Sequence, residues 1–393
     1  MSKHLSELQR DDLFICAQCG YCNAACPIYE ELRWESASPR GKIYFLKALT
    51  QSRGLRNLLF GPRAKVDESY VQRLFECTVC GRCSEVCQVS IETTRLWETM
   101  REAAVRSGLA PEKVLELERA VVDTKNVFAM DHAERGEWVL YTGAEAPVKE
   151  KADIVYFAGC VTSYSGRLQN IAASISAIMN HVGEDWTVLG QDESCCGHPL
   201  RLNGVTDNVK EIVENNVEAI EAREPRRLVT GCPGCYLAFR DEYPEVLGRE
   251  LSFEVVHFTE LLHEYLRLGK IAPSKLRIKA TYHDPCELGR LAGIVEEPRY
   301  VLRRTVSRFI EAPENGVNGR CCGAGGGLKG HNLALSEALA DTRYEMLTNT
   351  GAQIIVSACP ACHQNLSEAA MRRETPLNIV DLAELMAQQL GLV

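Results

Sequence analysis

Cysteine is the residue type in this chain most able to do chemistry, with 18 copies among 393 residues. Eight of them form two runs in the N-terminal quarter. The runs are Cys16, Cys19, Cys22 and Cys26, and then Cys77, Cys80, Cys83 and Cys87. Both have the spacing C-x2-C-x2-C-x3-C, which is typical of loops that bind [4Fe–4S] clusters. Proline follows the first run, as Pro27, whereas Gln88 follows the second.

Three thiolates on a short loop can bind three corners of a cubane cluster, and in two-cluster ferredoxins the fourth cysteine binds the other cluster. By that rule the first cluster takes Cys16, Cys19, Cys22 and Cys87, and the second takes Cys77, Cys80, Cys83 and Cys26. Structural zinc is an alternative, but zinc sites usually show two C-x2-C pairs. Disulfides are disfavoured by the two-residue gaps between the cysteines and by a reducing compartment.

The other ten cysteines form a second duplication. They are Cys160, Cys195, Cys196, Cys232 and Cys235, followed by Cys286, Cys321, Cys322, Cys359 and Cys362. Corresponding positions differ by 126 or 127 residues, and each set reads C-x34-C-C-G-x34/35-C-x2-C. The sequence Gly-Cys-Pro-Gly-Cys at 231–235 also matches Ala-Cys-Pro-Ala-Cys at 358–362. One domain therefore occurs twice, at about 152–270 and 277–393.

Short apolar runs alternate with helical patterns in both copies, which predicts parallel sheets flanked by helices. The expected strands are 154–158, 186–189, 228–230, 277–282 and 353–357, and the expected helices lie near 168–182 and 207–223. Cys160, Cys232, Cys286 and Cys359 each follow an expected strand. Ligands bind at the carboxyl ends of parallel strands, so each set of five thiolates is expected to meet in one crevice. Spacing alone leaves zinc and iron–sulfur open there.

The expected fold class is α/β with a helical N-terminal part. A helical pattern near 41–59 indicates that the part around the first eight cysteines is mostly helical. We expect a two-cluster ferredoxin-like domain at 1–108, a helical linker at 109–150, and the repeated α/β domains at 151–272 and 273–393.

Composition excludes several classes of protein. With 46% hydrophobic and 25% charged residues, the chain is expected to be globular. A net charge of −9 argues against nucleic-acid binding. The sequence shows no secretory signal and no apolar run long enough to span a bilayer. A cytoplasmic location is therefore expected, because clustered thiols stay reduced there.

Three further motifs carry a family resemblance. They are Ser38-Pro-Arg-Gly-Lys, His283-Asp-Pro-Cys-Glu-Leu-Gly-Arg and Cys321-Cys-Gly-Ala-Gly-Gly-Gly. Together with the cysteine sets, they resemble the cysteine-rich CCG family of heterodisulfide reductases. That family includes iron–sulfur subunits of glycolate oxidase and anaerobic glycerol-3-phosphate dehydrogenase. The layout is most similar to the fused D-type heterodisulfide reductase subunit, and the resemblance covers nearly all of the chain except the linker.

The resemblance implies that each set of five cysteines holds a noncubane [4Fe–4S] cluster, in addition to the two cubane clusters. One noncubane cluster would use Cys160, Cys195, Cys196, Cys232 and Cys235, and the other Cys286, Cys321, Cys322, Cys359 and Cys362. The first copy departs from the pattern, since His198 and Pro199 replace the glycine run that follows Gly323. The two sites need not be equivalent.

The sequence is compatible with two main functions. In the first, an oxidoreductase subunit relays electrons through the cubane clusters to the CCG sites, where a disulfide is cleaved. In the second, the chain only transfers electrons for a flavoprotein dehydrogenase of the 2-hydroxyacid, glycerol-3-phosphate or acyl-CoA type. The implied partners are a flavoprotein or other iron–sulfur subunits, with a membrane cytochrome as a further candidate. No catalytic residue is assigned, and a zinc or interaction module is disfavoured.

Weaker signals have plainer explanations. Residues 325–330 match G-x-G-x-x-G, but they do not follow a strand directly, so glycines that let the backbone approach a cluster explain them better than a nucleotide site. His283 and His363 flank cysteines and could transfer protons, although packed histidines are the better expectation. Arg40 and Arg290 could balance cluster charge or form ordinary salt bridges.

Overall fold

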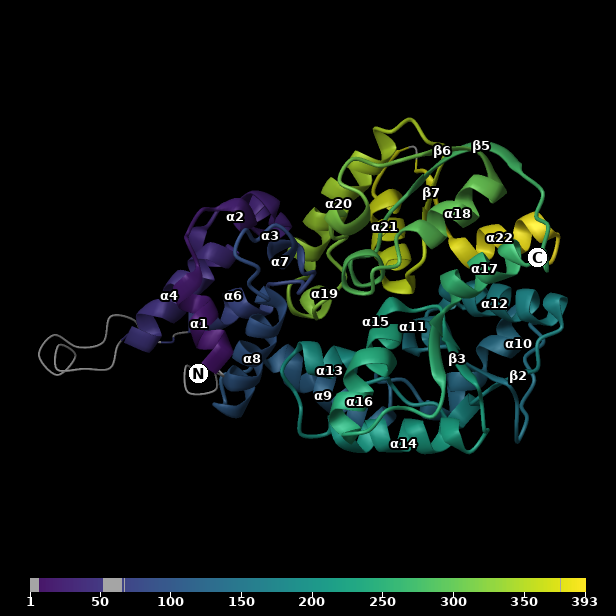
Figure 1. Cartoon of the computed structure of the whole chain (residues 1–393), viewed down its shortest axis with the longest axis horizontal. Helices are drawn as coiled ribbons and strands as arrows, with labels where there is room; N and C mark the ends of the chain where they lie inside the picture. The colour runs from purple at the N-terminus through teal and green to yellow at the C-terminus, as the bar shows by residue number, and fades with distance from the viewer. Residues whose placement is uncertain (1–6, 52–65, 67, 375) are drawn as a thin grey trace, which may run out of the picture.

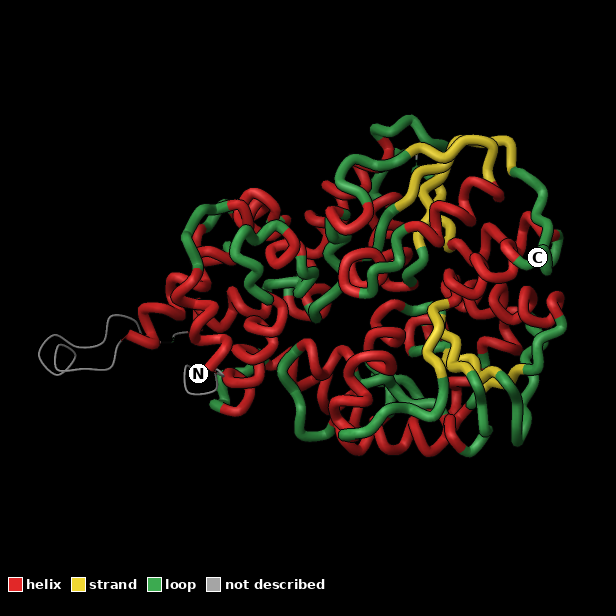
Figure 2. Tube along the Cα trace, in the orientation of Figure 1, coloured by secondary structure: helices red, strands yellow, loops and turns green. Residues whose placement is uncertain are grey.

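The computed structural model describes residues 7–51, 66, 68–374 and 376–393. A group of helices forms the N-terminal end of the molecule, and two α/β units with separate sheets form the rest (Figures 1 and 2). The expected fold class, a helical N-terminal part followed by two repeated parallel-sheet units, is confirmed.

The N-terminal helices are short and surround the first eight cysteines. They are α1 (Glu7–Ile15), α2 (Tyr21–Ala25), α3 (Pro27–Leu32), η2 (Glu35–Ala37), α4 (Pro39–Gln51), α6 (Glu68–Phe75), α7 (Arg82–Glu85) and α8 (Thr93–Arg106). The helix expected at 41–59 is confirmed as far as Gln51, and 52–59 lie outside the described residues. Gly20 and Gly81 have φ of 89° and 74° and precede α2 and α7. Only glycine adopts that left-handed turn readily, so each cysteine loop can double back on itself.

The first repeat contains a four-stranded parallel sheet. Its strands are β1 (Ile154–Phe157), β2 (Trp186–Val188), β3 (Arg227–Thr230) and β4 (Glu254–His257), in the order β2-β1-β3-β4. Ile154 on the central strand β1 lies opposite Trp186 on one side and Arg227 on the other. The helices around it are α11 (Cys160–Tyr164), α12 (Gln169–Val182), α13 (His198–Leu202), α14 (Val209–Glu221), α15 (Pro233–Leu237), α16 (Tyr243–Leu247) and α17 (Phe258–Arg267), with the short turns η4 (Gly166–Leu168), η5 (Gly190–Asp192) and η6 (Ala238–Glu242).

The second repeat has the same strand order, β6-β5-β7-β8. Its strands are β5 (Leu276–Tyr282), β6 (Val306–Ile310), β7 (Ile354–Ser357) and β8 (Asn378–Asp381). Its helices are η7 (Cys286–Leu291), α18 (Glu296–Thr305), η8 (Gly316–Asn318), α19 (Leu328–His331), α20 (Leu333–Thr348), α21 (Pro360–Met371) and α22 (Leu382–Leu390). Strands β4, β6 and β8 were not predicted, because they lie at sheet edges, are half-exposed and lack an apolar run.

The two repeats share one apolar core. Helix α12 of the first repeat packs against α22 of the second, and α17 packs against α18. Ile175 and Met179 of α12 belong to the same buried cluster as Leu385 and Met386 of α22. The repeats are therefore held together by apolar packing, the dominant favourable contribution to folding.

Between the helical part and the first repeat lie α9 (Glu112–Thr124), η3 (His132–Gly136) and α10 (Trp138–Thr142). They fall in the stretch expected to be a linker. Trp138 and Ile154 share the core cluster of the repeats, and α9 also packs against α19 of the second repeat.

Arg101 of α8 joins the helical part to both repeats. Its guanidinium is fully buried and donates hydrogen bonds to the carbonyls of Leu74 (2.8 Å) and Cys77 in the helical part. It also donates to the carbonyl of Leu202 in the first repeat (2.7 Å) and to that of Gly326 in the second (2.8 Å). One side chain thus satisfies four buried carbonyl groups from three parts of the chain.

Equivalent helices of the two repeats begin with equivalent capping boxes. His257 caps α17 and exchanges hydrogen bonds with the N3 position, Glu260, while Asp381 caps α22 and pairs with Glu384 in the same way. The reciprocal bonds satisfy amide groups that a helix N-terminus leaves open. Burial lowers the pKa of His257 to about 3.

This histidine gives the fold a dependence on pH. Unfolded His257 regains a pKa of about 6.5 and binds a proton below that pH, whereas the folded residue stays neutral. Its contribution to stability is complete above about pH 6.5 and is lost progressively toward pH 3. We expect urea unfolding of the apoprotein to lose up to about 1.4 kcal/mol per pH unit in that window from this residue. The variant His257→Asn keeps a good N-cap and should flatten the slope; equal slopes in both proteins would contradict the assignment.

Candidate iron–sulfur centres

The first N-terminal loop, residues 16–26, gathers its cysteines around Cys22. Cys16, Cys19 and Cys26 of the same loop and Cys87 of the second loop are near enough to influence the Cys22 charge. Burial and these neighbours raise the pKa of Cys22 to about 11. Cys19 is the one exposed cysteine among the 18, all of which lie in the described residues. The structure thus brings the fourth cysteine of the second loop to the first.

The second N-terminal loop, residues 77–87, receives Cys26 in the same way. Burial raises the pKa of Cys26 to about 12, and the neighbouring thiols that add to this effect are Cys77 and Cys83. Cys83 is in turn influenced by Cys77 and Cys80. The proximity of Cys87 to the first loop and of Cys26 to the second fits the crossed ligand sets, which stay a prediction because Cys26 also lies near Cys22.

All five cysteines of the first repeat meet at the carboxyl edge of its sheet. Cys160 begins α11 directly after β1, and Cys232 is the N-cap of α15 after β3. Thiol contacts run from Cys160 to Cys195, from Cys195 to Cys196, from Cys196 to Cys235, and from Cys235 to Cys232. We call this group the first five-cysteine site.

The second repeat assembles its cysteines in the same order. Contacts run from Cys286 to Cys321, then to Cys322, Cys362 and Cys359. The sulfur atoms of Cys322 and Cys362 are 3.2 Å apart. This group is the second five-cysteine site. Five convergent thiols exceed the four ligands of a tetrahedral structural zinc site, so the donor set fits a larger thiolate-bound group better.

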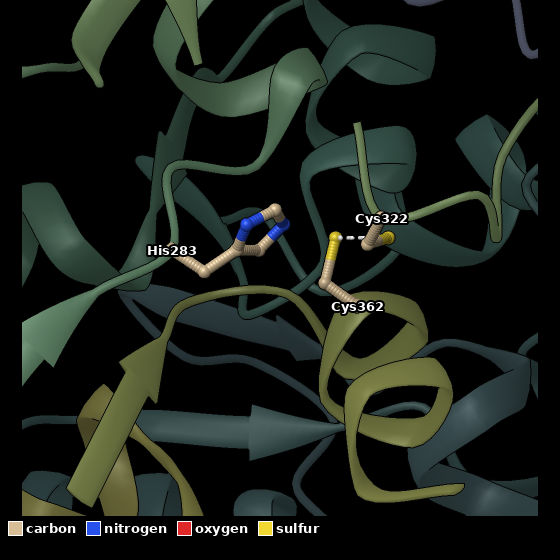
Figure 3. Close-up of side chains that lie close together, drawn as sticks. All are labelled: His283, Cys322 and Cys362. Atoms are coloured by element: carbon tan, nitrogen blue, oxygen red, sulfur yellow. Dashed lines mark hydrogen bonds between the residues drawn. The ribbon is translucent and has the colours of Figure 1, made fainter. Parts of the chain in front are cut away.

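At the second site, the position of His283 also fits a bound thiolate-ligated group. Its ring lies beside Cys322 and Cys362, with the three possible ligand atoms within 4.8 Å of one another (Figure 3). Burial, helped by the nearby Arg343, lowers the pKa of His283 to about 3, so the ring is neutral. Nδ1 accepts from Arg343 Nε (3.2 Å), so the proton is on Nε2, a buried atom with no hydrogen-bond partner among the described residues. An unpaired donor among thiols fits an anionic thiolate or sulfide acceptor.

The second five-cysteine site also touches the second N-terminal loop. The Cys80 thiol contacts that of Cys321. Arg290, two turns after β5, donates to the carbonyls of Cys80 (2.6 Å) and Val317 (2.6 Å) and holds the two segments together. Arg290 therefore bridges backbone groups, which the sequence alone did not reveal.

A buried ion pair lies beside the first five-cysteine site. Arg135 donates to Glu193 (2.6 Å) and to the Cys160 sulfur (3.3 Å). Glu193 in turn accepts from the amides of Ala158 and Gly159, both at 2.9 Å. The pair fixes the end of β1 and places a cation next to a thiol. The ion pair leaves no signal in the sequence, because its two members lie 58 residues apart and form no motif.

A cavity of about 680 Å³ opens between the repeats. All five cysteines of the first site line it, together with the glycine run that follows Cys322 and part of α21. The cysteines of the second site do not line it, although all of them lie in the part of the chain that the structure describes. Its volume is in the range of small-molecule pockets, about 300–1,000 Å³. The two five-cysteine sites are thus not equivalent: one faces the cavity and the other faces the N-terminal loops.

The glycine run at 325–330 is explained by close packing. A side chain at Gly326 would overlap the carbonyl of Thr78 in the second N-terminal loop, and one at Gly327 would overlap the side chain of Asn203. The helix that follows, α19, has only four residues. This geometry favours backbone approach over a dinucleotide site.

The remaining weak signals are structural. His363 is buried and lies near Ser367 and Glu384, 3.4 and 3.5 Å away, in agreement with a packed histidine. Arg40 pairs with Glu35 at 2.7 Å near the surface. The contacts of His363 are those of a packed residue, whereas Arg40 also lies beside Gly20 and within electrostatic reach of the Cys22 thiol.

Comparison with known proteins identifies the family of this chain. Residues 12–91 match the 4Fe-4S dicluster domain, and 154–240 and 280–367 match the cysteine-rich domain. The D-type subunit of dihydromethanophenazine:CoB–CoM heterodisulfide reductase from Methanosarcina acetivorans is 36% identical, covering 100% of this chain and 97% of that protein. The chain belongs to the family of D-type heterodisulfide reductase subunits. The predicted resemblance is confirmed, and the protein is an iron–sulfur redox subunit whose domains indicate [4Fe–4S] clusters.

More distant relatives have other names. The EtfAB:quinone oxidoreductase of Syntrophomonas wolfei is 26% identical, covering 95% of this chain and 58% of that protein. A subunit of the fumarate reductase (CoM/CoB) of Methanothermobacter marburgensis is 27% identical over 94% of this chain and 71% of its own length. A hypothetical protein from Helicobacter pylori has the same fold, with a TM-score of 0.58 and 11% identity over 99% of this chain and 74% of that one.

The Methanosarcina and Methanothermobacter relatives are both named as subunits of a reductase. Among the residues that the structure describes, every helix is too short or too polar to cross a bilayer.

Proposed function

We propose that the protein reduces a disulfide as the iron–sulfur subunit of a multisubunit complex. Electrons enter at the N-terminal loops and pass to the two five-cysteine sites. Two cubane clusters would be held by Cys16, Cys19, Cys22 and Cys87 and by Cys77, Cys80, Cys83 and Cys26. Two noncubane clusters would be held by Cys160, Cys195, Cys196, Cys232 and Cys235 and by Cys286, Cys321, Cys322, Cys359 and Cys362. When bound, these groups supply one-electron transfer.

The cavity between the repeats is the observation that carries this proposal. It gives a small molecule access to five thiols of the first site. The contact between Cys80 and Cys321 supports an order in which the second five-cysteine site lies between the N-terminal loops and the cavity. Cleavage of a disulfide takes two electrons, and neighbouring sites that each hold one electron can supply them together.

The partners that we propose are a flavoprotein or other iron–sulfur subunits, with a membrane cytochrome as a further candidate. The exposed Cys19 supports electron entry at the first N-terminal loop. A cytoplasmic location stays a prediction from the many reduced thiols.

A second candidate is an electron-transferring subunit of a flavoprotein dehydrogenase complex. The likeness to the EtfAB:quinone oxidoreductase over 95% of this chain favours it. In that case electrons would pass between the flavoprotein and another acceptor without cleavage of a disulfide.

Metal analysis and one assay separate these functions. We expect anaerobically purified protein to contain about sixteen iron atoms per chain, because each [4Fe–4S] cluster holds four. Zinc with little iron would contradict the cluster assignment. With reduced viologen as donor, small disulfides should be reduced to thiols. Rapid electron exchange with a flavoprotein, combined with no thiol formation from any disulfide, would favour the second candidate.

A further inference from the structure

Three buried arginines gather where the second N-terminal loop meets the second repeat. They are Arg82 of that loop, Arg320 directly before Cys321, and Arg343 of α20. We call this group the arginine cluster. It belongs to the same junction as the contact between the thiols of Cys80 and Cys321.

Two carboxylates lie against two of these three cations. Glu314 Oε2 is 2.8 Å from Arg82 Nη1 and 3.8 Å from Arg320 Nη1, so the two guanidinium groups share one acceptor. Glu30 accepts from Arg320 at 2.7 Å. The side chains of Glu314 and Glu30 are 34% and 41% exposed, so solvent screens part of their negative charge.

The third cation, Arg343, is fully buried among neutral groups. Its Nε donates to His283 Nδ1 (3.2 Å), and its Nη1 donates to the carbonyl of Pro313 (2.9 Å). Burial lowers the pKa of Arg343 to about 10, which leaves the guanidinium charged at neutral pH. The charges of Arg320 and Arg82 also lower this pKa, so the three cations lie within electrostatic reach of one another.

The donors of the arginine cluster are only partly satisfied. The nearby carboxylate of Asp284 already accepts two bonds from Arg299, at 2.8 and 3.1 Å. Four buried nitrogen atoms have no hydrogen-bond partner in the part of the chain that the structure describes, namely Arg82 Nε, Arg320 Nε, Arg320 Nη2 and Arg343 Nη2. Buried cations with open donors are costly unless an anion compensates them. The thiolate-bound groups that fit the two adjoining sites would be such anions.

The first repeat lacks this excess of positive charge. At the equivalent positions, 126 and 127 residues earlier than in the second repeat, stand Ser194 and Asn216. Their contact is a neutral hydrogen bond of 3.0 Å from the Ser194 amide to the Asn216 side chain. Arg135, the cation beside Cys160, is paired with the buried carboxylate of Glu193. The arginine cluster therefore distinguishes the second five-cysteine site from the first.

We infer that the arginine cluster stabilises the reduced forms of the two centres that meet at Cys80 and Cys321, so that electrons collect at this junction. The inference rests on the proposed function. Each electron that arrives from the reduced redox partner adds one negative charge to a centre, and no bond forms or breaks in this step. Buried positive charge nearby favours the added electron, because attraction is strong at low dielectric. Two adjoining centres thus hold the two electrons that one disulfide needs.

A redox titration of the cluster-loaded full chain, followed by electron paramagnetic resonance, tests the inference. The titration uses the Cys196→Ala background, in which the second five-cysteine site is the one that remains. Arg320→Gln should make reduction of that site about tenfold less favourable, a shift of about −59 mV for one electron. Arg320→Lys keeps the positive charge and should keep most of the native potential.

Glu314→Gln tests the sign of the effect. It removes a negative charge from the same cluster and should raise the potential of the second site, whereas Arg320→Gln lowers it. Because its side chain is partly exposed, this variant also carries the test if Arg320→Gln fails to load clusters.

Two controls locate the effect. Arg303→Gln removes a half-exposed arginine of α18 in the same repeat and should leave the potential unchanged. In the Cys322→Ala background the first five-cysteine site remains, and Arg320→Gln should not shift its potential.

The outcomes separate this inference from the function on which it rests. Unchanged potentials in Arg320→Gln and Glu314→Gln, or shifts in the same direction, would overturn the inference and leave disulfide reduction standing. Opposite shifts in a loaded chain that reduces no disulfide would overturn the proposed function and support the inference. A native chain that binds zinc with little iron would overturn both.

Discussion

A Cys322→Ala variant is expected to lose disulfide reduction by about 10³-fold or more, because the second five-cysteine site would no longer pass electrons to the first. Cys322 lies in the middle of the second five-cysteine site, between Cys321 and Cys362. Loss of its thiol should remove about four iron atoms from that site. The second site touches the N-terminal loops through the contact between Cys321 and Cys80. Its loss should therefore interrupt electron transfer from those loops to the cavity. Iron analysis and thiol release measure the two effects.

Cys196→Ala is the matched variant in the first repeat. It should also abolish thiol release, since Cys196 lines the cavity. The two variants differ in which five-cysteine site can still accept electrons. In Cys196→Ala the second site remains, and we expect viologen to reduce it rapidly. In Cys322→Ala, a protein electron donor too large to enter the cavity should reduce the first five-cysteine site slowly in freeze-quenched spectra. Rapid filling of that site in Cys322→Ala would contradict the proposed order.

An Arg101→Met variant is expected to lose about 3–5 kcal/mol of unfolding free energy, the scale for removal of one partner from a buried charged network. The guanidinium is the hydrogen-bond donor to four carbonyl groups, those of Leu74, Cys77, Leu202 and Gly326. Methionine would fill much of the same space but leave those acceptors without this donor. Urea unfolding of the apoprotein gives the change in stability.

Arg106→Met on the same helix is the control for this substitution. Arg106 is half-exposed and pairs with Glu102 at 2.8 Å, so its loss should cost under about 1 kcal/mol. Arg101→Lys should fall nearer to Arg101→Met than to the native protein, because an ammonium group lacks the planar fork of donors. Equal stability of the Arg101 and Arg106 variants would show that the bonds to the repeats contribute little.

Features that depend on nearby residues were predictable from the sequence. The spacing of the two short loops predicts a crossed use of Cys26 and Cys87. The central strands β1 and β7 were visible as apolar runs, whereas the edge strands β4, β6 and β8 were not. The second duplication was readable because ten cysteines repeat in register.

Contacts between separate elements appeared only in the folded chain. The pairing of Cys80 with Cys321, the ion pair of Arg135 and Glu193, and the position of Arg101 join residues that share no motif. The spacing of the first eight cysteines indicated two [4Fe–4S] sites, because their ligand spacing is a property of local chain geometry. At the two sets of five cysteines spacing alone left zinc and iron–sulfur open, and the family resemblance implied the clusters. Which site faces the N-terminal loops and which faces the cavity depends on how helices and sheets pack, and that packing leaves no periodic signal in the chain.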